Sequence, residues 1–188
     1  MRVLLIPLLA AVLVLSPPVG AAEVSGIEIP DQVRLDNQTL ILNGAGVRRK
    51  FFFRIYVGAL YLPRATSDAE QAITMAGPKR LLMHFIYDEL TREQIVEAWN
   101  EGFEANLTAD QRQALRDGIT RFNELFTAVA AGDRLYIDYL PGEGTRVMRN
   151  GVTRGIVEGE TLAQAVLRIF LGEDPADSRL KRGMLGRG

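Results

Sequence analysis

The chain has 188 residues with no cysteine and a single histidine, and its 22 basic side chains nearly balance its 23 acidic ones. Without cysteine there are no disulfides and no thiolate metal sites, and one histidine, His84, cannot form a histidine cluster. The near-neutral charge lacks the basic excess that phosphate contacts require, which argues against nucleic acid as a partner. We therefore expect neither a metal nor a cofactor.

The N-terminal segment, residues 1–22, has the pattern of a secretory signal peptide. It begins with a charge at Arg2, continues with an apolar run over residues 3–15 and ends in small residues at 20–22. The run is shorter than the roughly 20 residues that a membrane-crossing helix needs, so we expect cleavage near Ala22 and no integral membrane anchor in the mature chain. The remainder, residues 23–188, has no linker or repeat. We expect it to be one domain, soluble in the periplasm or secreted.

The first half of the mature chain is rich in strand patterns. Runs of β-branched, aromatic and other apolar residues predict strands over residues 24–29, 38–42, 47–62 and 80–87. The segment 47–62 is interpreted as one continuous strand. Before the last of these strands, Ser67 begins an S-x-x-E capping box, which predicts the start of a short helix.

Helical patterns dominate the second half. Capping boxes of the form T-x-x-Q at Thr91, Thr108 and Thr161 predict three helix starts, each followed by apolar residues at helical spacing. Strands are predicted between the second and third helices, over residues 134–140, 145–149 and 152–157, with a type I′ turn at Asn150-Gly151. This order predicts an α+β protein, in which helices cover one face of an antiparallel sheet.

Two local features have structural rather than chemical interpretations. His84 lies in the middle of the predicted strand 80–87 and is interpreted as a structural histidine at the sheet surface. Gly44-Ala45-Gly46 precedes a strand, and Arg49 stands at the third glycine position of a dinucleotide loop, so that motif does not apply. The glycines instead indicate a tight bend or a close approach of two backbones.

The remaining motifs are spread in order over nearly the whole mature chain. They are Asn43-Gly44-Ala45-Gly46-Val47-Arg48 with residues 56–62, Gly132-Asp133, residues 139–142 with Gly144-Thr145, and residues 159–162 and 170–172 with Pro175 and residues 180–182. Together they resemble the bacterial, exported branch of the chalcone isomerase-like proteins. The resemblance implies a chalcone isomerase-like open-faced β-sandwich, in which a long antiparallel sheet carries a layer of helices and a ligand cleft lies between the layers.

In the family that the chain resembles, the arginine at the position of Arg48 points into the cleft. Residues of equal parity share a face in a continuous strand, so Arg48 and Tyr56 are expected on one side and Arg49 on the other if no bulge intervenes. A guanidinium and a phenol above an apolar floor suit an apolar or amphiphilic molecule with an anionic or carbonyl head. The alternative is that Arg48 pairs with a carboxylate across the sheet. Arg49, Lys50 and Arg54 are expected to face solvent.

The resemblance also bears on catalysis. Plant chalcone isomerases add a phenolate to an enone, with an arginine supported by Thr, Tyr and Asn side chains. Here the two threonine positions correspond to Tyr56 and Val152, and of the helical positions only Asn100 is carried over. Relatives that bind fatty acids without catalysis use an arginine and a tyrosine for the carboxylate.

We therefore expect a binding protein for a small apolar carboxylate, with Arg48, Tyr56 and Asn100 as ligand-binding residues. One alternative is an isomerase or intramolecular lyase that acts on an unsaturated ketone, with Arg48 as its catalytic residue. The other is a protein-interaction module.

Overall fold

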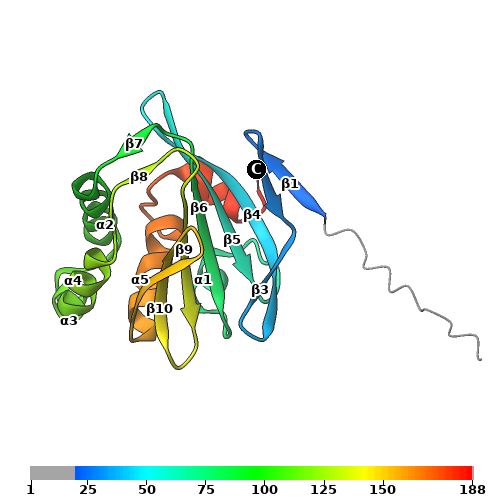
Figure 1. Ribbon diagram of the computed structural model, residues 1–188. Helices are drawn as coiled ribbons and strands as arrows, with labels where there is room; N and C mark the ends of the chain where they lie inside the picture. The colour runs from blue at the N-terminus through cyan, green and yellow to red at the C-terminus, as the bar shows by residue number, and fades with distance from the viewer. Residues whose placement is uncertain (1–19, 188) are drawn as a thin grey trace, which may run out of the picture.

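A seven-stranded antiparallel sheet forms the centre of the molecule (Figure 1). The structure, a computed structural model, describes residues 20–187, so residues 1–19 of the predicted signal peptide lie outside the described residues. The strands are β3 Gln32–Leu35, β4 Gln38–Lys50, β5 Phe53–Leu62, β6 Lys79–Phe85, β9 Arg134–Leu140, β10 Gly144–Arg149 and β11 Val152–Val157. Their order across the sheet is β11-β10-β9-β6-β5-β4-β3.

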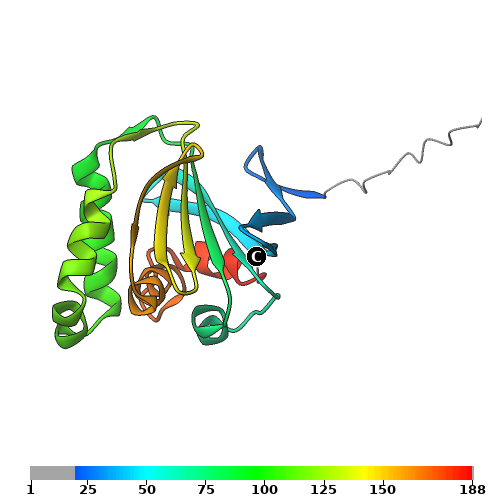
Figure 2. The same cartoon turned by 60° about the horizontal axis from the view of Figure 1, so that its bottom comes forward.

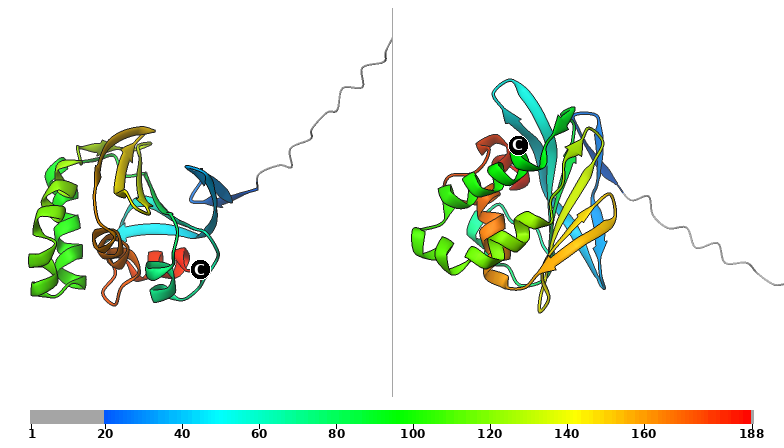
Figure 3. Two further views of the ribbon diagram at one scale, coloured as in Figure 1. Left: turned by 90° about the horizontal axis from the view of Figure 1, so that it is seen from below. Right: turned by 60° about the vertical axis from the view of Figure 1, so that its left-hand side comes forward.

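Helices cover one face of the sheet and a small hairpin covers part of the other (Figures 2 and 3). The helices are α1 Ala69–Thr74, α2 Arg92–Asn106, α3 Ala109–Ala114, α4 Arg116–Glu124, α5 Glu160–Leu171 and α6 Ser178–Met184. The hairpin consists of β1 Ala21–Val24 and β2 Ile27–Pro30. A separate two-stranded ribbon is formed by β7 Glu89–Leu90 and β8 Val129–Ala130. Within residues 20–187, no helix is long and apolar enough to cross a membrane.

Two apolar clusters flank the sheet. The larger lies between the sheet and the helices and contains Trp99 of α2, Phe122 of α4 and Phe170 of α5. The rings of Trp99 and Phe122 pack edge to face, with centroids 5.1 Å apart. The smaller cluster lies under the β1–β2 hairpin and contains Ile29 and Val57. Because β5 is covered on both faces, its sequence is almost continuously apolar rather than alternating.

The turns differ in part from those that the sequence predicts. The continuous strand over residues 47–62 is wrong, because the chain reverses at Phe51-Phe52 and forms the β4–β5 hairpin. The strand over residues 24–29 is wrong for the same reason, since it reverses at Ser25-Gly26. The type I′ turn at Asn150-Gly151 is confirmed, because both residues have positive φ, 50° and 82°.

Two of the four predicted capping boxes are confirmed. The Thr91 and Thr108 side chains each accept a bond from the N–H of the glutamine three residues later, and that glutamine accepts one from the threonine N–H. The box at Thr161 is wrong, since α5 begins after Gly159 without a side-chain cap. The short helix α1 is capped by Asp68, one residue later than predicted.

A close approach of two backbones explains the first glycine of the Gly-Ala-Gly motif. Helix α6 lies against β4, and a Cβ atom on Gly44 would collide with the backbone carbonyl oxygen of Gly183. A Cβ atom on Gly183 would in turn lie 2.5 Å from the carbonyl oxygen of Ala45. Gly46 is different, because its Cβ would lie at an ordinary distance of 3.5 Å from Leu180.

Gly44→Ala is therefore expected to lower the free energy of unfolding by about 1–3 kcal/mol, because α6 must move off the strand to admit the methyl group. Gly46→Ala, two residues along the same strand, is the matched control and should cost less. Urea unfolding followed by the fluorescence of Trp99, the single tryptophan, measures both. Equal losses in the two variants would contradict the close contact.

Candidate ligand-binding site

The β4–β5 hairpin brings Arg48 and Tyr56 together. The two residues are directly opposite each other, and the guanidinium carbon of Arg48 lies 5.6 Å from the centroid of the Tyr56 ring. The register shifts after Arg48, which leaves Ile55 as an extra residue on β5. Ile55 and Tyr56 consequently both join the apolar cluster on the helix side. The two candidate residues thus meet by cross-strand pairing, across a bulge, and not by parity along one strand.

Arg48 carries a buried donor without a partner. Its Nε atom is buried and has no hydrogen-bond acceptor among the described residues, and no described carboxylate forms an ion pair with it. Asp177, the N-cap of α6, instead accepts bonds from the backbone N–H groups of Arg49, Arg179 and Leu180. Leaving a buried donor unpaired is unfavourable, and an acceptor on a ligand would remove that cost.

Two adjacent cavities meet at Arg48. Both are also lined by Leu90, Gln94 and Ala98. The inner cavity has a volume of about 40 Å³ and lies between the sheet, α2 and α5, with apolar walls that include Phe85, Ile95, Trp99 and Ile169. The outer cavity has a volume of about 230 Å³ and extends toward the tip of the β4–β5 hairpin, with walls that include Phe53, Ile55 and Tyr87.

Tyr56 supplies a second donor beside the guanidinium. Burial raises the pKa of the Tyr56 phenol, and the charge of Arg48 opposes this rise without cancelling it. The phenol therefore keeps its proton at neutral pH and can donate a hydrogen bond to an anionic head group. Its ring packs edge to face on Phe85, with centroids 5.4 Å apart, which fixes its position.

Gln94 is a polar lining residue that the sequence pattern did not single out for a ligand. Its Oε1 atom accepts the backbone N–H of Thr91 at 2.9 Å, as the capping box predicts. That bond fixes the side chain, and its amide nitrogen has no hydrogen-bond partner among the described residues. The capping role is visible in the sequence, whereas the position beside Arg48 depends on how α2 packs against the sheet.

Asn100 lies outside both cavities. It is exposed on α2, and its Oδ1 atom accepts a bond of 2.8 Å from the side-chain amide of Asn123 on α4. Successive side chains of a helix point about 100° apart. Trp99 lines the inner cavity, and Asn100, the next residue of α2, therefore points away from it, toward α4. We leave Asn100 out of the site proposed below.

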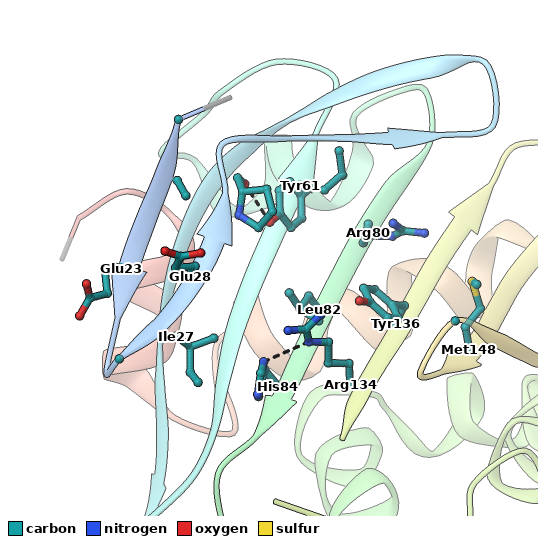
Figure 4. A pocket seen from close by; sticks show the side chains of 16 residues that line it. Glu23, Ile27, Glu28, Tyr61, Arg80, Leu82, His84, Arg134, Tyr136 and Met148 are labelled. Carbon is teal, nitrogen blue, oxygen red and sulfur yellow. Dashed lines mark hydrogen bonds between the residues drawn. The ribbon is translucent and has the colours of Figure 1, made fainter. Parts of the chain in front are cut away.

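A larger cavity, of about 1030 Å³, lies on the opposite face of the sheet under the β1–β2 hairpin (Figure 4). Its floor on the sheet includes Tyr61, His84 and Tyr136, and Glu23 and Glu28 lie on the hairpin side. Burial, together with the neighbouring Arg134, lowers the pKa of His84, so this histidine is neutral at pH 7. The sequence did not predict this cavity.

Of the two cations among residues 20–187 that line the larger cavity, only Arg80 is paired with a carboxylate. Arg80 holds Asp138 through two bonds of 2.6 and 2.8 Å, and the Nε atom of Arg134 donates to Nδ1 of His84 at 3.3 Å. Gly20, which also lines this cavity, lies before the predicted cleavage site, so removal of the signal peptide would alter the wall. Because Arg80 is already paired and Glu23 and Glu28 place negative charge on the hairpin side, the larger cavity is less suited to hold an acidic head group than the site at Arg48.

These features define an open-faced β-sandwich with a candidate small-molecule site between the sheet and its helices. The chain belongs to the chalcone isomerase-like family, whose sequence profile matches residues 21–186. Among solved structures, its fold is similar to that of a fatty-acid binding protein of Arabidopsis thaliana, with a TM-score of 0.67 and 15% sequence identity, covering 86% of this chain and 92% of the other. No curated protein sequence matches the chain. The expected family and fold are confirmed.

Proposed function

We propose that this protein binds a small apolar carboxylate, such as a fatty acid, in the cavities that meet at Arg48. The observation that carries the proposal is the buried, unpaired Nε atom of Arg48 beside Tyr56, next to an apolar wall. A guanidinium holds a carboxylate through two parallel, charge-assisted hydrogen bonds. The similar fold of a fatty-acid binding protein supports this choice of ligand.

Arg48 orients the ligand. At the rim of the outer cavity the exposed Lys50 and Glu97 carry opposite charges that offset each other, whereas Arg48 attracts an acidic head to the junction of the two cavities. The inner cavity, at about 40 Å³, has room for a water or a head-group oxygen only. The tail therefore lies in the outer cavity, against Phe53, Tyr87 and Leu90.

The side chains around Arg48 match those of the plant enzymes only in part, which favours binding over the isomerase alternative. Val152, at one of the two matched threonine positions, is 61% exposed on the edge strand β11. Three strands, β10, β9 and β6, separate β11 from β5. Asn100 also lies outside the cavities, so the hydroxyl groups that line them are the phenols of Tyr56 and Tyr87, without the threonine and asparagine groups that support the arginine in the plant enzymes.

Native mass spectrometry of the purified protein tests the proposal. We expect bound fatty acids that are released on denaturation, and less of them on Arg48→Ala. Rapid cyclisation of a hydroxychalcone that Arg48→Ala abolishes would establish the isomerase instead, and a bound neutral ketone in place of fatty acids would contradict the carboxylate as ligand. A protein that carries no small molecule and binds none added would leave the interaction module as the better account.

We also propose that the chain is exported, with a mature N-terminus at or near Glu23. The proposal rests on the charge, apolar run and small residues of segment 1–22. N-terminal sequencing and intact mass of protein from the soluble exported fraction are expected to show the processed chain. Full-length protein in the membrane fraction would contradict export with cleavage.

A further inference from the structure

The turn between β4 and β5 exposes three consecutive phenylalanines. Phe51 is 85% exposed, Phe52 98% and Phe53 55%. Among the described residues only two other large apolar side chains are exposed, Val152 and Ile156, and both belong to the distant edge strand β11. We call residues 50–54 the aromatic tip. It projects beyond the rest of the molecule at the top of Figure 1 and of the right-hand view in Figure 3.

The backbone of the aromatic tip gives no structural reason for its aromatic residues. Phe51 has a φ of 55°, a left-handed conformation that is unfavourable for a bulky side chain. Two other hairpin turns of the chain, Ser25-Gly26 and Asn150-Gly151, use small or turn-forming residues at positive φ. The side chain of Phe51 is mostly exposed, so burial does not explain its strained conformation.

The aromatic tip also carries charge of one sign. Lys50 precedes the phenylalanines and Arg54 follows them, and both side chains are exposed. At the base of the tip, the Phe53 ring packs edge to face on Tyr87, with centroids 5.5 Å apart. The result is an apolar point with flanking cations. That is the chemistry by which a peripheral protein inserts aromatic rings below lipid head groups and pairs its cations with acidic ones.

We propose that the aromatic tip docks on the surface of an anionic lipid bilayer, with the Phe51 and Phe52 rings in the interface. Lys50, Phe51 and Phe53 also line the outer cavity that begins at Arg48. Docking therefore places the mouth of that cavity at the lipid surface, where an acyl chain can pass between bilayer and protein without crossing water. The docking itself goes beyond the proposed ligand site and does not depend on it.

Sedimentation with phospholipid vesicles tests the docking. We expect the processed protein to bind vesicles of phosphatidylglycerol and phosphatidylethanolamine, and to bind phosphatidylcholine vesicles more weakly. The double variant Phe51→Ser and Phe52→Ser should lose at least about tenfold in apparent affinity, because two apolar rings no longer enter the interface. Lys50→Gln combined with Arg54→Gln should lose about fivefold per charge on acidic vesicles only.

Val152→Ser is the matched control, since it removes an exposed apolar side chain far from the aromatic tip and should bind vesicles as the unmodified protein does. Circular dichroism should show the same fold in all variants, because the substituted side chains are exposed. Absence of vesicle binding, or equal binding by the Phe51 and Phe52 double variant, would overturn the proposal. The proposal would also be overturned if the unmodified protein were a dimer and the double variant a monomer, because the aromatic tip would then be a contact between two copies of the chain.

Discussion

Arg48→Ala is expected to weaken the binding of a fatty acid roughly ten- to a hundredfold. The substitution removes a charge-assisted contact between a carboxylate and the buried Nε atom of Arg48, for which about 1.5–3 kcal/mol is the usual scale. Isothermal titration calorimetry with dodecanoate measures the change. Trp99 lines the inner cavity, so its fluorescence gives a second reading. Tyr56→Phe removes one hydroxyl donor and should cost less than Arg48→Ala.

Two arginine variants serve as controls for that measurement. Arg49→Ala changes the next residue along β4, whose side chain is exposed and whose backbone N–H keeps its bond to Asp177. It should bind as the unmodified protein does. Arg134→Ala probes the larger cavity on the opposite face. If Arg134→Ala weakens binding and Arg48→Ala does not, the ligand lies under the β1–β2 hairpin and the proposed site is wrong.

Asp138→Ala is expected to lower the free energy of unfolding by about 3–5 kcal/mol, the largest stability change that we predict. Asp138 is fully buried on β9, directly opposite Arg80 on β6 and Arg146 on β10. It accepts two bonds from Arg80, at 2.6 and 2.8 Å, and one from Arg146, at 3.0 Å. Removing the carboxylate leaves two mostly buried guanidinium groups that repel each other across the strand.

Thermal and urea unfolding measure this effect, with a fall in melting temperature of about 10 °C for a domain of this size. Asp117→Ala is the control, because it removes an acid from an ion pair whose side chains are 68% and 81% exposed. Such a surface pair contributes little, so the loss should stay within about 0.5 kcal/mol. Similar losses in the two variants would mean that burial of Asp138 has no energetic consequence.

The sequence predicts the fold well where local chemistry determines structure. The capping boxes at Thr91 and Thr108 and the Asn150-Gly151 turn act through neighbouring residues, and all three are present in the structure. The turn at Phe51-Phe52 was missed because strong strand-forming residues occupy positions that usually carry glycine or asparagine. The capping box at Thr161 is wrong because α5 begins earlier, after Gly159, which places Thr161 inside the first turn.

The candidate site was predictable only in part. The sequence predicts that Arg48 and Tyr56 lie on the same face, because they have equal parity along one strand. In the structure the two residues are neighbours for another reason, since they pair across the β4–β5 hairpin beside a bulge. The position of Gln94 beside them depends on the packing of α2, which no local pattern encodes. The larger cavity depends on the pairing of β6 with β9, whose residues Leu82 and Tyr136 are far apart in the chain. Such long-range pairing leaves no signal in a single sequence.

The proposed function depends on Arg48 holding the acidic head of an apolar ligand. Carbon-13 NMR of dodecanoic acid labelled at its carboxyl carbon, titrated with acid while bound, tests it most directly. Pairing with the guanidinium should hold the pKa of the bound carboxyl below that of the free acid, and Arg48→Ala should raise it, whereas Arg49→Ala should not. A titration curve that Arg48→Ala leaves unchanged, but that Arg134→Ala shifts, would place the head group in the larger cavity and not at Arg48.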